Sequence, residues 1–267
     1  MNKISIGCAG WDYKDWIGPF YPKKLERQNH LAYYAKFFRI TEVNSTFYNL
    51  PSIDTVNKWN SRTPPNFRFI VKMWQKITHY LNEPAVVSRI NEFFYHMEPL
   101  KAKIVAYLLQ FPPWFEYSEK HLNQLKLLIN EISSIFNLII ELRHNSWLKS
   151  EILSEFIDGT QKILGTTYIP SVSPFYIPNQ KYYYIRLIGD RELTVFNRIQ
   201  RDQEDAIRHL EQNIRKLNEM PNIYEIFIIV NNHFAGFAPE TANILKKRLG
   251  LEFHNFDKQK KIFDYLT

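Results

Sequence analysis

Short apolar runs alternate with longer amphipathic segments along the whole chain. Eight of the runs are nearly continuous stretches of aliphatic and aromatic residues, a pattern typical of parallel strands that are covered on both faces. The sequence therefore predicts eight buried strands, at residues 3–9, 40–45, 67–73, 103–111, 138–143, 166–170, 182–189 and 225–232.

Between the predicted strands, apolar residues recur every three or four positions, as in helices that bury one face. Residues 119–132 show this spacing directly after Ser118, a residue type that favours N-caps, and residues 203–217 show it up to a proline, Pro221. The pattern predicts further helices at residues 29–38, 52–62, 85–97 and 240–249.

The alternation of strands and helices predicts a parallel sheet, and eight repeats predict that the sheet closes into a TIM-type (β/α)₈ barrel. An open doubly wound sheet is the alternative, but no G-x-G-x-x-G motif follows the first strand. The proline-rich residues 170–181 occupy the place of the sixth helix, so we expect an irregular crossover there. Without a linker or a low-complexity tract, we expect residues 1–267 to form a single domain.

Composition narrows the class of protein further. Hydrophobic residues make up 45% and charged residues 23%, as in soluble globular proteins, and the net charge of +7 favours anionic ligands. Cys8 is the only cysteine, which excludes an intramolecular disulfide and a zinc site built from several thiolates. The N-terminus lacks the apolar segment of a signal peptide, and no apolar run approaches the roughly 20 residues of a membrane span, so we expect a cytoplasmic protein.

Polar residues stand at the carboxyl ends of the predicted strands, where active sites lie in (β/α)₈ barrels. Burying charged groups there is costly unless they are paired or bind something. Because a barrel brings its strand ends together, we expect one mixed-charge pocket, with structural salt bridges as the alternative. The residues are Glu42, Asn44, Lys72, Gln110, Glu141, Arg143, His144, Arg186, Asn231, Asn232 and His233.

An aromatic segment, residues 10–22, follows the first strand and is too irregular for a helix. Its side chains either cover the pocket, with Trp11 contacting the ligand, or plug the end of the barrel through Trp11, Trp16 and Phe20. The sequence leaves both interpretations open.

Eight motifs in this chain resemble, in order, the signatures of the YecE-like proteins, domain-of-unknown-function family 72. They lie between about residues 4 and 249 and read GCAGWDYKDWIGPFYP, TEVNSTFYNLPS, W…RTPPNFRFIVK, KITH, LLQFPPWF, ELRHNSW, YIRLIG and VNNHFAG. The resemblance implies a TIM-type barrel and no particular reaction. The family pattern often has a histidine before the glycine of the seventh motif, where this chain has Ile188, so a mechanism that needs this imidazole is in doubt here.

The pocket residues favour an enzyme that acts on an anionic small molecule, such as a phosphorylated sugar or a nucleotide fragment, as a hydrolase or isomerase. Lys72, Arg143 and Arg186 are suited to phosphate or carboxylate, and Gln110 and the asparagines Asn44, Asn231 and Asn232 to substrate hydroxyls. Glu42 and Glu141 are the candidate general acid and base, since burial raises a carboxyl pKa, and His233 and His144 are alternative proton carriers.

Two other functions use the same residues. Glu42, Glu141, His144 and His233 are ligand types found in divalent-metal isomerases and nucleases, although no compact motif joins them and we predict no cofactor. Alternatively, the barrel binds nucleic acid or nucleotides without catalysis, through its positive charge and the aromatic residues at 10–22 and 111–117.

Overall fold

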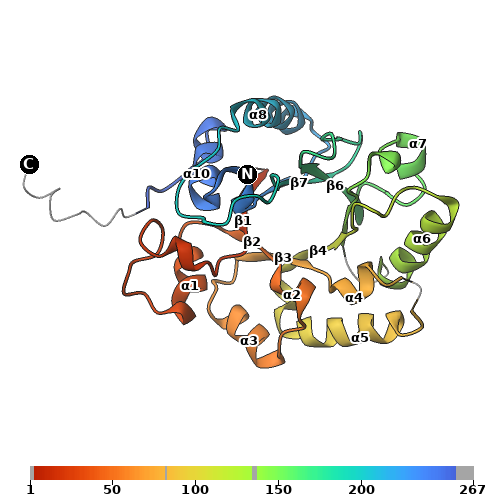
Figure 1. Ribbon diagram of the computed structural model, residues 1–267, viewed down its shortest axis with the longest axis horizontal. Helices are drawn as coiled ribbons and strands as arrows, with labels where there is room; N and C mark the ends of the chain where they lie inside the picture. Colours follow the sequence, from red (N-terminus) through yellow and green to blue (C-terminus); the bar gives the residue numbers. More distant parts are fainter. Residues whose placement is uncertain (1–2, 82, 134–136, 257–267) are drawn as a thin grey trace, which may run out of the picture.

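The eight predicted strands close into a parallel barrel in their sequence order, β1 to β8, with helices around the outside (Figure 1). The computed structural model describes residues 3–81, 83–133 and 137–256. The last strand closes the barrel by pairing with the first, from Ile4 beside Ile226 to Cys8 beside Val230. The (β/α)₈ prediction is therefore confirmed, with strands β1 (Ile4–Ala9), β2 (Ile40–Val43), β3 (Arg68–Lys72), β4 (Ile104–Gln110), β5 (Leu138–Glu141), β6 (Lys162–Tyr168), β7 (Tyr182–Leu187) and β8 (Glu225–Val230).

Five longer helices cover the outside of the barrel, as the apolar spacing predicts. They are α3 (Ile53–Ser61), α5 (Val86–Met97), α6 (Glu119–Ser133), α8 (Glu204–Glu219) and α10 (Ala238–Arg248). Ser118 caps α6 as predicted, because its hydroxyl accepts the backbone N–H of His121 at 3.2 Å. The predicted helix at 29–38 is shorter in the structure, where it is α1 (His30–Tyr34).

Short helices, most of them directly after strands, were not predicted. They are α2 (Ser45–Tyr48), α4 (Gln75–Thr78), α7 (Ser150–Leu153) and α9 (Asn232–Ala235). Four residues give one helical turn, too short for an amphipathic period to show in the sequence. Three of them, α2, α4 and α9, lie at the carboxyl end of the barrel, since they follow β2, β3 and β8.

The sixth repeat differs most from the prediction. β6 begins at Lys162, not at residue 166, because the Asp158 carboxylate accepts the backbone N–H groups of Thr160, Gln161 and Lys162 and turns the chain into the strand. Residues 169–181 contain no helix, which confirms the predicted irregular crossover.

Two apolar layers hold the barrel together. Outward-facing strand residues pack under the helices in one large core. A second cluster fills the inside of the barrel and makes it solid; it consists of Ala9, Ile40, Ile70, Ala106, Leu108, Ile139, Ile163, Tyr184, Phe227 and Ile229. Any ligand site along the barrel axis must therefore lie above or below this cluster. None of the helices in the described ranges has the length and apolarity that crossing a membrane requires.

Candidate functional site

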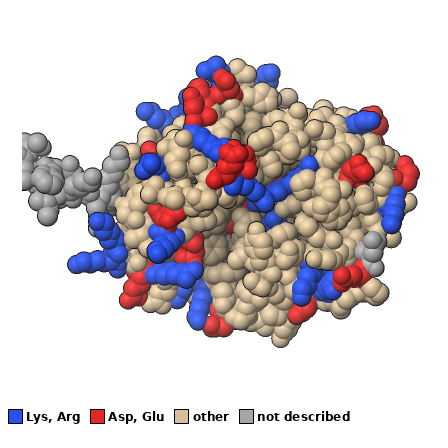
Figure 2. Space-filling model, in the orientation of Figure 1, with Lys and Arg blue, Asp and Glu red and all other residues tan. Residues whose placement is uncertain are grey.

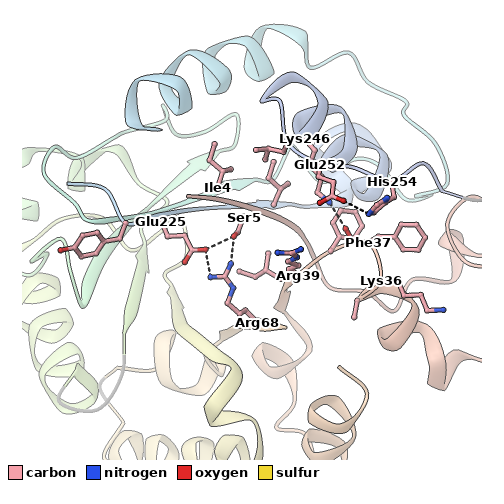
Figure 3. Close-up of a pocket in the computed structure, with 16 residues that line it drawn as sticks. Ile4, Ser5, Lys36, Phe37, Arg39, Arg68, Glu225, Lys246, Glu252 and His254 are labelled. Atoms are coloured by element: carbon pink, nitrogen blue, oxygen red, sulfur yellow. Dashed lines mark hydrogen bonds and ion pairs between the residues drawn. The ribbon is translucent and has the colours of Figure 1, made fainter. Parts of the chain in front are cut away.

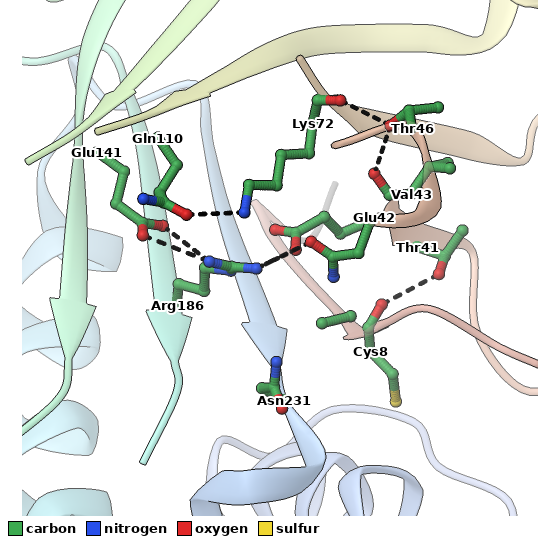
Figure 4. A network of polar contacts seen from close by, with 12 residues as sticks. Cys8, Thr41, Glu42, Val43, Thr46, Lys72, Gln110, Glu141, Arg186 and Asn231 are labelled. Carbon is green, nitrogen blue, oxygen red and sulfur yellow. Dashed lines mark hydrogen bonds and ion pairs between the residues drawn. The ribbon is translucent and has the colours of Figure 1, made fainter. Parts of the chain in front are cut away.

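Five of the polar strand-end residues lie close together inside the barrel, at the carboxyl ends of its strands (Figure 4). Alternation along each strand explains their direction: Glu42 points inward, between Thr41 and Val43 of the outer wall. The same alternation places four further side chains inside, from β3, β4, β5 and β7. The buried set is Glu42, Lys72, Gln110, Glu141 and Arg186, each at most 5% exposed.

Arg186 is the centre of an ion-pair network. Its Nη2 atom lies 2.6 Å from Glu42 Oε1, and its Nη1 atom lies 3.2 Å from Glu141 Oε2. Nη2 also donates to Asn44 Oδ1 at 3.0 Å. Glu141 in turn accepts from Arg143 Nε at 2.7 Å. Glu141, the last residue of β5, and Arg143 just after it therefore belong to a buried chain of charges that runs Glu42, Arg186, Glu141, Arg143.

Tyr184 anchors this network from below. Its hydroxyl donates to Glu42 Oε2, and its ring lies in the apolar filling. The ring packs beside Gly165 of β6, where an added Cβ would come within 3.2 Å of it. Tyr184 was not among the predicted site residues, although it lies two residues before Arg186 and therefore on the same face of β7.

The cations of the network fix Glu141 as a carboxylate. Burial would raise the pKa of Glu141, but the charges of Arg186, Arg143 and Lys72 outweigh burial and lower the pKa to about 2. The expected rise in the pKa of Glu141 is therefore wrong, because the prediction considered burial without the neighbouring guanidinium groups. Burial likewise opposes the charge of Arg186, yet Glu42 and Glu141 raise its pKa above the usual value.

Lys72 is the exception, because it forms no ion pair with a carboxylate of the described residues. Its Nζ atom donates to Gln110 Oε1 at 2.7 Å and lies 3.6 Å from the centre of the Phe47 ring. Burial, with the positive charge of Arg186, lowers the pKa of Lys72 well below 10.5. In all, three buried cations face two carboxylates.

Several buried donors at this end of the barrel find no acceptor among the described residues. In the network they are Arg186 Nε and Arg143 Nη2, which lies 2.7 Å from Glu141 Oε1 but is not aligned for a hydrogen bond. In the adjoining segments they are Trp74 Nε1 after β3 and Asn232 Nδ2 after β8. Such groups are rare in folded proteins, where buried donors are paired with protein atoms, ordered water or an ion.

The segment after β8 has mainly structural contacts. Asn231 lies at the end of β8 (Figure 4), where its Oδ1 atom accepts the backbone N–H of His233 at 3.1 Å and caps α9. Asn232 Oδ1 accepts from Trp16 Nε1 at 3.1 Å and from the backbone N–H of Ala238 at 3.0 Å. The His233 ring packs edge-on against Phe196 at 4.8 Å, and burial lowers its pKa.

Two further candidates also have structural contacts. The Trp11 ring packs edge-on against Trp59 and Phe69, at 5.5 and 6.3 Å, and these rings belong to the core outside the barrel. His144 Nδ1 lies 2.7 Å from Ser146 Oγ and accepts the backbone N–H of that serine. Trp16 and Phe20 are buried in the outer core as well, so the segment 10–22 packs the wall of the barrel.

The metal and nucleic-acid alternatives gain no support from this geometry. Within residues 3–81, 83–133 and 137–256, no three His, Cys, Asp or Glu side chains come together as metal ligands. Acidic and basic side chains are intermixed over the face in Figure 2, without a continuous basic stripe.

A cavity of about 590 Å³ lies at the opposite, amino-terminal end of the barrel (Figure 3). Its polar groups are largely paired: Arg68 contacts Glu225 at 2.5 Å and Ser5 at 2.6 Å, and Lys246 donates to the Phe37 carbonyl at 2.8 Å. The ion-pair network and its unpaired donors lie at the other end, so we place the candidate site there.

Known proteins resemble the chain over nearly all of its length. The family model described as protein of unknown function DUF72 matches residues 5–263. UPF0759 protein YunF of Bacillus subtilis is 23% identical over 94% of this chain and 96% of its own length. UPF0759 protein YecE of Escherichia coli is 30% identical over 53% of this chain and 48% of its own length.

Solved structures of similar proteins share the fold. A DUF72 family protein from Thermotoga maritima aligns with a TM-score of 0.76 and 27% identity, over 92% of this chain and 99% of that one. One from Enterococcus faecalis aligns with a TM-score of 0.74 and 22% identity, over 94% of this chain and 99% of that one.

Proposed function

From the premise that the chain belongs to the DUF72 family, we propose that the carboxyl end of its barrel binds the phosphate or carboxylate group of an anionic small molecule, as the binding site of an enzyme. The observation that carries the proposal is the surplus of buried positive donors: among the described residues, Lys72 has no carboxylate partner, and Arg143 Nη2 and Arg186 Nε have no hydrogen-bond acceptor.

An oxyanion would supply the acceptors that the network lacks. Arginine and lysine both recognise phosphate and carboxylate through charge-assisted hydrogen bonds. With Lys72 protonated, the five charged side chains carry a net charge of +1, which an anion would neutralise. The bound anion would also favour the protonated form of Lys72, whose pKa burial lowers.

The chemistry that we propose for the site differs from simple Glu-based acid–base catalysis. Glu141, with a pKa of about 2, remains charged and positions Arg143 and Arg186. Glu42 accepts from both Tyr184 and Arg186 and has the same positioning role. Lys72 has a lowered pKa and no carboxylate partner, so we assign proton transfer to its amine.

Substituting Lys72 by methionine tests the proposal. Methionine keeps an apolar stem against Phe47 and removes the charge. We expect wild-type protein to bind inorganic phosphate or citrate in calorimetric titrations, and Lys72→Met to weaken this binding about 10- to 100-fold, the effect of losing one charge-assisted hydrogen bond. The exposed Lys24, replaced in the same way, is the matched control and should bind like wild type.

A stability measurement separates ligand binding from a structural role of Lys72. Removing an uncompensated buried cation should leave the free energy of unfolding unchanged or raise it. The proposal fails if neither anion binds to wild-type protein, or if Lys72→Met binds both as tightly as wild type does.

A further inference from the structure

The segments after β2, β3 and β4 carry exposed aromatic rings beside the ion-pair network. Tyr48 ends α2 and is 60% exposed, Tyr80 follows α4 and is 50% exposed, and Trp114 follows β4 and is 62% exposed. Single exposed apolar residues are ordinary on a protein surface. Three large aromatic side chains on neighbouring segments at the carboxyl end of the barrel form a more specific pattern.

Ring contacts connect Tyr48 and Trp114 to Lys72, and Tyr80 lines a cavity together with His79 and Trp114. The ammonium group of Lys72 lies 3.6 Å from the centre of the Phe47 ring. Phe47 packs edge-on against Tyr48 and His79, each at 5.1 Å, and His79 packs edge-on against Trp114 at 6.5 Å. The rings therefore form a continuous path from the buried cation to the exposed surface. We call Phe47, Tyr48, His79, Tyr80 and Trp114 the aromatic rim.

His79 contributes to the rim as a neutral ring. Burial, with the positive charges of Lys72 and Arg143, lowers the pKa of His79 to about 4. The shift by Lys72 and Arg143 also indicates that His79 lies close to the network. At neutral pH the rim thus presents uncharged planar surfaces beside a group of cations.

A small cavity lies at one part of the rim. It measures about 200 Å³ and is lined by His79, Tyr80, Leu81, Glu83, Trp114, Phe115, His121 and Gln124. Most of its wall is aromatic, and its size suits one planar ring better than a long chain. His79 belongs both to this cavity and to the ring path that begins at Lys72.

We propose that the aromatic rim is a second subsite, which holds the planar base of a nucleoside phosphate whose phosphate group binds Lys72 and the two arginines. This inference rests on the anion site proposed above and adds the class of ligand. Bases stack on aromatic side chains whatever their sequence, because every base has a π face. Since Phe47 and His79 lie between Lys72 and Trp114, the base and the phosphate must be joined by a spacer, and the sugar of a nucleotide provides one.

Three probes of increasing size test the rim: inorganic phosphate, ribose 5-phosphate and AMP, each titrated calorimetrically into the full-length protein. We expect AMP to bind at least tenfold more tightly than ribose 5-phosphate. Trp114→Ala and Tyr80→Ala should each weaken AMP binding on the order of tenfold and leave the affinity for ribose 5-phosphate unchanged. Tyr95→Ala, at a 68% exposed position on α5, is the matched control for Tyr80→Ala and should change neither affinity.

The outcomes separate the rim from the anion site. Equal affinities for AMP and ribose 5-phosphate would overturn the rim and leave the anion site standing. Failure of all three probes to bind would overturn the rim, and failure of citrate as well would overturn the anion site. A 5′-phosphorylated single-stranded tetranucleotide distinguishes the sources of the ligand: if it binds more tightly than AMP and Trp114→Ala weakens it, the base–phosphate chemistry holds with a strand end as the source.

Discussion

Replacing Glu141 by glutamine perturbs the network at the carboxylate that two arginines share. Glu141 is completely buried between Arg186 and Arg143. The substitution keeps the size of the side chain and removes its charge. Glu42 is then the one carboxylate left in the network. Of the two arginines, it contacts Arg186 and not Arg143.

Two independent arguments give a similar loss of unfolding free energy for Glu141→Gln. The network lowers the pKa of Glu141 from 4.5 to about 2, and at about 1.4 kcal/mol for each tenfold change in proton affinity the charged form stabilises the fold by about 3 kcal/mol at pH 7. Removing one partner of a buried ion pair costs about 3–5 kcal/mol, because the other charge stays buried without compensation. We therefore expect Glu141→Gln to lower the free energy of unfolding by about 3 to 5 kcal/mol.

Urea denaturation at pH 7, followed by tryptophan fluorescence, measures this loss directly. Asp54→Asn is the matched control: Asp54 pairs with Lys58 on the exposed face of α3, and its loss should cost less than about 0.5 kcal/mol. A loss below about 1 kcal/mol for Glu141→Gln would show that the cations do not depend on this carboxylate, and the description of the network would be wrong.

Two further predictions concern acid and the segment after β8. Because the folded-state pKa of Glu141 is depressed, its contribution to the free energy of unfolding is fully present above pH 4.5 and is lost as the pH falls towards about 2. The stability difference between wild type and Glu141→Gln, measured by urea denaturation across this range, should shrink as the pH falls. A difference that does not change with pH would contradict the assigned pKa. Asn232→Ala removes the acceptor of two buried donors, Trp16 Nε1 and the Ala238 N–H, and should lower the free energy of unfolding by at least about 2 kcal/mol. Unchanged stability with weakened phosphate binding would instead show that Asn232 is a ligand contact.

Most of the fold was predictable because burial dictates it. Parallel strands covered on both faces need continuous apolar runs, and runs such as residues 225–230 have few other interpretations. The errors fall where a local interaction decides the structure. The start of β6 depends on a turn held by Asp158, and α9 depends on a cap from Asn231, neither of which has an apolar period.

The composition of the site was predictable, but its pairing was not. Alternation along the strands places Glu42, Lys72, Glu141 and Arg186 on inner faces, and barrel closure brings them together. Which carboxylate meets which cation depends on strand stagger and side-chain conformation. The direction of the pKa shift of Glu141 follows from that pairing, so burial alone predicted the wrong sign.

The aromatic rim shows why neighbouring segments must be seen together. Phe47, His79 and Trp114 lie in three separate segments, and of the three Trp114 alone belongs to a stretch, residues 111–117, whose aromatic residues were considered for base stacking from the sequence. The barrel places those segments side by side. The ring contacts run from Lys72 through Phe47 and His79 to the exposed Trp114.

The charge balance decides between a structural network and a binding site. Buried ionic networks that serve stability alone satisfy their donors, since a partly satisfied network costs more than an apolar one. The Glu42–Arg186–Glu141–Arg143 chain pairs its four charges, but Arg186 Nε and Arg143 Nη2 have no hydrogen-bond acceptor among the described residues. Lys72 adds a third cation that this chain does not require, and its lowered pKa shows the cost of holding it there. The anion that we propose for the carboxyl end of the barrel would account for such a cation in this position.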